Sequence, residues 1–136
     1  MTDYLKAWAD ELLASRPLSV KQRLTAVGIR DAHLGPRLEF AKVQVSAEPA
    51  KHFEVINRVS LSEELIRLGF PGSVIMGVLD VLMVGLPAPV RDIRLVLEKA
   101  EYDPVDSSPI AFRQAGRDAG RKIIDAMRKS DGPEAD

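Results

Sequence analysis

The fold is decided by residues 91–129, which read RDIRLVLEKAEYDPVDSSPIAFRQAGRDAGRKIIDAMRK. From Arg91 to Glu98 apolar residues alternate with polar ones, which predicts a strand. Ser108 and Pro109 then supply an N-cap and a first helical position. One apolar face follows at helical spacing, made of Phe112, Ala115, Gly116, Ala119, Ile123 and Met127. This stretch therefore predicts a strand, a short loop and a long amphipathic helix that ends near residue 129.

The sequence before this stretch contains a predicted hairpin. Alternating apolar residues run over 22–30 and again over 38–45, and Gly35-Pro36 lies between the two runs. Glu48-Pro49 ends the second run, and a shorter third strand follows over 53–57. With the strand in the deciding stretch, these segments predict a four-stranded, mostly antiparallel sheet.

Three more helical segments are predicted. An amphipathic helix covers Tyr4–Ala14, and one or two helical turns cover Ser60–Leu68, with Gly69 as a left-handed stop. Pro71 opens another helix, which Gly85 is placed to end. Strands followed by a helix, another strand and another helix predict an α+β two-layer sandwich, with the helices on one face of the sheet.

Composition limits the class of protein. The chain has 136 residues, 46% of them hydrophobic, and a formal net charge of −1, which indicates a single domain without a global positive field. The absence of cysteine excludes disulfides, thiolate metal sites and a cysteine nucleophile, and we expect a cytoplasmic protein. His33 and His52 lack ligand spacing, so no metal site or cofactor is expected. The apolar run Val74–Val84 is about half the ~20 residues that cross a bilayer, so no membrane partner is expected.

Several motifs in a fixed order are similar to one family. They are Asp92 to Leu97, Tyr102, Val105-Asp106-Ser107-Ser108, Ala111-Phe112-Arg113 and Ala115-Gly116. Matching upstream positions are Val74, Gly77, Gly85, Pro89-Val90, Glu48-Pro49 and Phe53-Glu54. Together they resemble domain IV of bacterial translation elongation factor G over about two-thirds of the chain, residues 37–128.

This resemblance implies both a fold and a function. The family fold is a four-stranded sheet backed by two helices, with an uncommon left-handed βαβ crossover. We therefore expect an N-terminal helix and strand extension over 1–36, a domain IV-like unit over 37–129 and a disordered acidic tail over 130–136. The implied function is that of a stand-alone, non-catalytic module that binds the ribosome or structured RNA. The sequence Gly-x-x-x-x-Gly-Lys-[Ser/Thr] is absent, so we expect no GTP hydrolysis. No motif in the sequence identifies a small-molecule substrate.

Two groups of residues are candidates for RNA contact. One is the basic stripe of the last helix, which consists of Arg113, Arg117, Arg121 and Lys122. The other is the loop before that helix, with Glu101, Tyr102, Asp103 and Asp106. Each group also has a structural interpretation. The stripe is equally typical of a solvated face with intrahelical pairs to Asp118 and Asp125. Residues 106–108 are also suited to cap the helix, and Tyr102 to anchor the loop against the sheet.

The sequence departs from the family pattern in three places. Asp103 stands where the family has a histidine, and 33–37 replaces a glycine-rich basic stretch, so two features expected to face RNA are missing. The third departure is an apolar outer stripe on the helix after Pro71, formed by Ile75, Met76, Leu79 and Met83. Trp8 and Leu12 of the first helix are candidates to cover it, and so is a second subunit. The alternative function is therefore a homo-oligomeric protein-interaction domain that keeps the fold without RNA binding.

The glycines of the last helix have a predicted structural role. Gly116 and Gly120 lie on its apolar side, where they lower the helix propensity. Close packing of the helix backbone against the sheet explains that arrangement. We therefore expect both to be packing residues and not part of a phosphate-binding loop.

Overall fold

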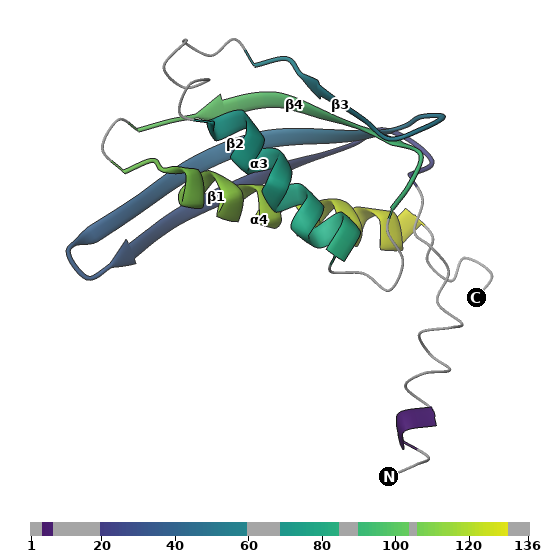
Figure 1. Ribbon diagram of the computed structural model, residues 1–136, viewed down its shortest axis with the longest axis horizontal. Helices are drawn as coiled ribbons and strands as arrows, with labels where there is room; N and C mark the ends of the chain where they lie inside the picture. The colour runs from purple at the N-terminus through teal and green to yellow at the C-terminus, as the bar shows by residue number, and fades with distance from the viewer. Residues whose placement is uncertain (1–3, 7–19, 60–68, 85–89, 104–105, 131–136) are drawn as a thin grey trace.

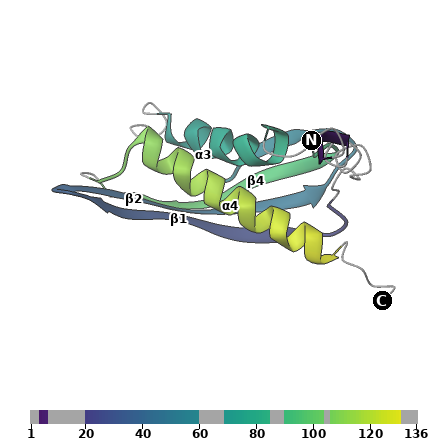
Figure 2. The same ribbon diagram turned by 90° about the horizontal axis from the view of Figure 1, so that it is seen from below.

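The computed structural model describes residues 4–6, 20–59, 69–84, 90–103 and 106–130. Its elements are, in chain order, β1 (Leu24–Leu34), β2 (Arg37–Pro49), β3 (Glu54–Asn57), α3 (Phe70–Leu79), η1 (Asp80–Val84), β4 (Ile93–Glu101) and α4 (Pro109–Ser130). The helices cover one face of the sheet, so the molecule has two layers (Figure 1; Figure 2). η1 continues α3 as a π-helical segment. Among the described residues, no helix is long and apolar enough to span a membrane.

The sheet is mixed and mostly antiparallel, as predicted. Its strand order is β1-β2-β4-β3. β1 pairs antiparallel with β2, and β2 pairs antiparallel with β4, whereas β3 runs parallel to β4. Because α3 lies between these two parallel neighbours in the chain, β3, α3 and β4 form the βαβ unit that the family resemblance implies.

The β1–β2 hairpin projects beyond the other strands (Figure 1). Its turn contains Gly35 with φ 66°, a left-handed backbone that glycine adopts without steric cost. β4 joins β2 only from the pair Lys42 and Glu101 onward. The β1–β2 turn and the β4–α4 loop therefore lie at the same end of the molecule, which we call the tip.

Most predicted elements are confirmed at or near their expected bounds. The hairpin, the short third strand, the fourth strand and the last helix are all present. Ser108 caps α4, because its Oγ accepts a hydrogen bond from the Ala111 N–H at 3.1 Å. Of the predicted first helix, only Tyr4–Lys6 is described, and it is helical. The predicted turns over 60–68, the end residue Gly85 and the tail beyond residue 130 lie outside the described residues.

The core lies between the sheet and the two helices. From the sheet, Val43, Val45, Leu95 and Leu97 are at most 1% exposed. The helices contribute Val74, Val78, Leu82, Phe112, Ala115, Ala119, Ile123 and Met127, which are equally buried. These α4 residues are the apolar face that the sequence predicts, so hydrophobic burial holds this helix on the sheet.

Glycines allow α4 to approach both neighbours at backbone distance. A Cβ on Gly77 of α3 would lie 2.0 Å from the Arg113 carbonyl oxygen, and one on Gly28 of β1 would lie 2.0 Å from the Ala115 carbonyl oxygen. The expectation that Gly116 and Gly120 pack against the sheet is wrong, because the atoms nearest to both belong to α3 and η1. The helix–helix crossing, which periodicity does not encode, decides this contact.

Candidate functional site

An ion cluster joins η1 to α4 directly beside the glycine crossing. Asp80 follows Gly77 by one helical turn, so the close approach of the helices brings its carboxylate to α4. Arg113 donates from Nε and Nη2 to the two carboxylate oxygens at 2.8 and 2.9 Å, and Arg117 donates from Nε at 2.9 Å. The bidentate geometry of Arg113 is the stronger form of such a pair.

The cluster fixes the charge of Asp80. The hydrogen bonds from Arg113 are the largest cause, and with those from Arg117 they lower the pKa of Asp80 from 3.8 to about 2 although burial opposes them. The pKa of Arg113 is raised, chiefly by its hydrogen bonds to Asp80. At neutral pH, the Asp80 carboxylate is therefore paired with two of the three arginines of the predicted RNA-binding stripe.

Lys122, the fourth basic residue of that stripe, is also engaged. Its Nζ donates to the Val27 carbonyl oxygen at 2.7 Å and lies 3.1 Å from Asp118. Asp118 in turn accepts the N–H of Ile29 at 2.9 Å. α4 thus satisfies outward-facing backbone groups of the edge strand β1, a common way to protect a sheet edge. Intrahelical pairing of the stripe is confirmed at Asp118–Lys122.

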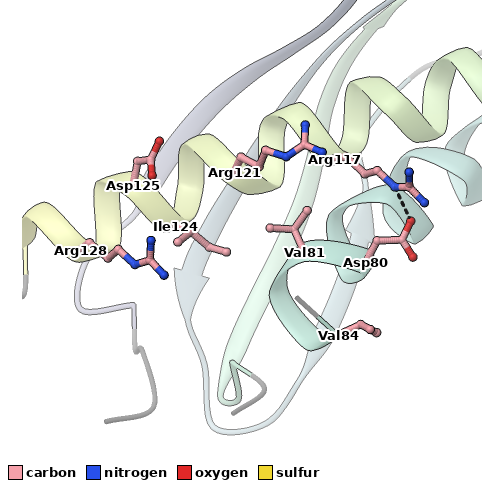
Figure 3. A pocket seen from close by; sticks show the side chains of 8 residues that line it. All are labelled: Asp80, Val81, Val84, Arg117, Arg121, Ile124, Asp125 and Arg128. Carbon is pink, nitrogen blue, oxygen red and sulfur yellow. Dashed lines mark hydrogen bonds and ion pairs between the residues drawn. The ribbon is translucent and has the colours of Figure 1, made fainter. Parts of the chain in front are cut away.

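Arg121 is the member of the stripe that remains available. Within the described part of the chain, Arg121 and the neighbouring Arg128 form no ion pair, and both are exposed. Both border a groove between η1 and the C-terminal half of α4, with a volume of about 630 Å³ (Figure 3). We call it the base groove because it lies at the end of the domain away from the tip. It is lined by Asp80, Val81, Val84, Arg117, Arg121, Ile124, Asp125 and Arg128.

The β4–α4 loop is fastened to β2. Ser107 donates from Oγ to the Phe40 carbonyl oxygen at 2.7 Å, and the Phe40 N–H donates to the Asp106 carbonyl oxygen at 3.0 Å. Asp103 supports the loop from within, because its Oδ1 accepts the Asp106 N–H at 2.9 Å. Of the acidic residues predicted to face RNA, Asp103 holds the loop through its carboxylate and Asp106 through its backbone, whereas Glu101 lies at the end of β4.

Tyr102 anchors this loop through an aromatic contact with α3. Its ring lies 5.9 Å from the ring of Phe70 at the start of α3, and Phe70 stacks on Phe112 of α4 at 4.6 Å. Tyr102 also packs against the hydrophobic core between the sheet and the helices. Its partly buried ring belongs to the support of the tip.

Two lysines at the tip were not among the sequence candidates. Lys42 and Lys99 line a hollow of about 190 Å³ on the sheet face opposite the helices, together with Val27, Val43, Gln44 and Glu101. The two lysines are diagonal neighbours, since Lys42 pairs with Glu101 and Lys99 with Gln44. Neither lysine forms an ion pair among the residues that the structure describes. The strand pairing that creates this hollow is a long-range feature without a local sequence motif.

The same sheet face is neutralised farther from the tip. Arg94 contacts Glu54 at 2.8 Å and Glu48 at 3.3 Å, and Arg23 contacts Glu98 and Glu48. The hydrogen bond from Arg94 is the main cause that lowers the pKa of Glu54. Arg94 and Arg23 are therefore paired, whereas Lys42 and Lys99 form no ion pair among the described residues.

The predicted apolar stripe is only partly exposed. Ile75 and Leu79 pack against the core from its margin, and Met83 is half-buried. Met76 is 50% exposed. The residues predicted to cover the stripe, Trp8 and Leu12, lie outside the described residues.

The fold defines an α+β two-layer domain built on a βαβ unit, and its site is a surface of charged and apolar side chains. The sequence model of the family "Elongation factor G, domain IV" matches residues 19–130, and the chain belongs to this family. A solved structure of a protein from Thermus thermophilus matches with a TM-score of 0.66 at 20% identity. The match covers 79% of this chain and 17% of the Thermus chain. No curated protein matches the sequence.

Proposed function

We propose that this chain is a non-catalytic, cytoplasmic translation-factor-like module that binds the ribosome or another structured RNA through its tip. The observation that carries the proposal is the hollow lined by Lys42 and Lys99, two cations without an ion pair in the described residues. Family membership supports a translational context. RNA presents phosphates that such ammonium groups neutralise, with release of counterions.

The rigidity of the tip supports this function. The Ser107 and Phe40 hydrogen bonds and the Tyr102–Phe70 contact hold the β4–α4 loop before any partner arrives. A preorganised loop loses little conformational entropy on binding. Asp103 is compatible with a surface that faces phosphates, because its carboxylate is already used as an acceptor inside the loop.

The arginines of α4 have a supporting role in this proposal. Arg113 and Arg117 are paired with Asp80, and Lys122 donates a hydrogen bond to the Val27 carbonyl oxygen of the edge strand β1. All three side chains are engaged within the domain, although Asp80 balances the charge of one of its two arginines, so we assign them to positioning α4 and not to direct RNA contact. The proposed RNA surface is accordingly smaller than the predicted stripe.

The test is co-sedimentation of the protein with separated ribosomal subunits across a salt series. Wild type is compared with the variant K42Q/K99Q, and the matched control is K51Q/K129Q, which removes the same charge from exposed positions outside the hollow. Two phosphate contacts correspond to a slope of log K against log salt of about −1.4 to −1.8. We expect the slope for K42Q/K99Q to be smaller in magnitude than the wild-type slope by this amount. The slope for the control should equal the wild-type slope. Equal slopes for both variants would refute the tip as the RNA surface.

A second candidate is the homo-oligomeric interaction domain, favoured by the half-exposed side chain of Met76 on the apolar stripe. In this interpretation Ile75, Met76, Leu79 and Met83 form one self-complementary patch. Size-exclusion chromatography with light scattering decides between the two. A dimer that the soluble, folded variant Leu79→Asp converts to a monomer supports oligomerisation, and a strict monomer for both proteins excludes it.

A further inference from the structure

The base groove lies on the half of α4 that the RNA-binding proposal does not use (Figure 3). Its apolar side chains are Val81, Val84 and Ile124, and Val84 is 81% exposed. Arg121 and Arg128 border these residues without an ion pair among the described residues. Val81 is half-buried and Ile124 is only 5% exposed, so Val84 supplies most of the exposed apolar surface of the groove. Such an apolar floor beside unpaired guanidinium groups is typical of a recognition surface.

We propose that the base groove binds an acidic amphipathic helix of a partner protein. Arg121, Ile124 and Arg128 are spaced i, i+3, i+7, so they share one face of α4. Seven residues of helix place the two arginines about 10 Å apart along the axis. A partner helix with two carboxylates seven residues apart and an apolar residue between them matches both the charge and the spacing.

The chemistry of the floor favours a protein over RNA. A phosphate backbone has no apolar side chain to cover Val81 and Val84, whereas a leucine-type side chain gains free energy by burying them. Arginine also forms bidentate pairs with carboxylates, and it is enriched at the energetic centres of protein interfaces. In addition, η1 is π-helical, a conformation that often occurs at functional sites.

The carboxylates of the groove leave these arginines available to a partner. Asp80 is occupied by Arg113 and Arg117. Asp125 points away from η1, whereas Ile124 and Arg128 point toward it (Figure 3). The groove is therefore apolar in the middle, and Arg121, Arg128 and the exposed carboxylate of Asp125 lie at its rim. This inference does not depend on RNA binding at the tip.

The probe is a fluorescein-labelled, end-capped helical peptide of about 18 residues, long enough to form helix alone. It carries glutamates at i and i+7 and leucines at i+3 and i+4. Binding is measured by fluorescence anisotropy to the full chain and to the variants R121Q/R128Q and V84S. K42Q/K99Q is the charge-matched control, and circular dichroism checks that each variant is folded.

We expect a Kd below about 1 mM for the wild type, weakened about tenfold or more by R121Q/R128Q and about threefold by V84S. A counterpart peptide with glutamine for glutamate should bind as weakly as the wild-type peptide binds R121Q/R128Q. K42Q/K99Q should bind the peptide as the wild type does.

Three kinds of result would overturn the proposal. The first is absence of binding at about 1 mM peptide, or equal binding to R121Q/R128Q. The second is a loss of ribosome affinity in R121Q/R128Q as large as that in K42Q/K99Q, which would assign the groove to RNA. The third is a wild-type dimer that R121Q/R128Q dissociates, which would assign the groove to a second copy of this chain.

Discussion

Replacement of Gly77 by alanine tests the helix crossing that sets the charge cluster. The added Cβ would lie 2.0 Å from the Arg113 carbonyl oxygen and 2.9 Å from the Arg117 nitrogen, and these are backbone atoms that no rotamer change can move. α3 and α4 must therefore separate by more than about 1 Å to restore ordinary contact. Overpacking of this kind costs about 3 kcal/mol, the upper end of its usual range. The higher helix propensity of alanine relative to glycine offsets about 1 kcal/mol of this cost.

The net expectation is a loss of about 2 kcal/mol in the free energy of unfolding, or roughly 8 °C in Tm for a domain of this size. Urea and thermal denaturation followed by circular dichroism measure it. Gly72→Ala is the matched control, because a Cβ at Gly72 meets no atom within 4 Å and the same propensity gain applies. Gly72→Ala should raise stability by up to about 1 kcal/mol. A Gly77→Ala variant as stable as Gly72→Ala would contradict a close backbone contact between α3 and α4.

Three further predictions concern side-chain hydrogen bonds. Because the folded-state pKa of Asp80 is lowered, the ionised carboxylate stabilises the fold above pH 3.8, and this stabilisation is lost toward pH 2. In urea titrations over that interval, the free energy of unfolding of the wild type should fall by about 1 kcal/mol more than that of Asp80→Asn, after allowance for solvent screening. An equal loss in both proteins would contradict it. Ser107→Ala removes the hydroxyl that donates to the Phe40 carbonyl oxygen and accepts from the Asp103 N–H. The Asp103 amide should therefore exchange its hydrogen several-fold faster, which corresponds to a loss of about 1 kcal/mol in the free energy of local opening. Asp118→Ala leaves the Ile29 N–H without its acceptor, and a similar acceleration is expected at that amide. Unchanged exchange in either variant would mean that the bond adds no protection.

Local sequence features were sufficient to predict α4 and the hairpin. Ser108 and Pro109 start α4 through cap and backbone chemistry that operates within four residues. Gly35 occupies a positive φ in the β1–β2 turn, as the Gly-Pro punctuation indicated. The family resemblance added what periodicity does not encode, namely that β3 and β4 are parallel neighbours around α3.

The contents of the site were harder to predict, because they depend on contacts between distant residues. Asp80 and Arg113 are 33 positions apart, and no helical spacing relates them. A sequence feature did exist, since Asp80 is the single charged residue in the apolar run 74–84, and such a carboxylate needs a partner. The hollow with Lys42 and Lys99 depends on the β2–β4 register, which shifts between Gln44 and Val45. Residue patterns within one strand do not reveal such a shift.

Lysine footprinting of the protein, alone and bound to isolated ribosomal subunits, tests whether the tip is the surface that binds RNA. Acetylation of each lysine is measured by mass spectrometry at low salt. The proposed tip surface predicts protection of Lys42 and Lys99, with Lys51 and Lys129 modified equally in both states. Protection of Lys51 or Lys129 with Lys42 and Lys99 still reactive would contradict it.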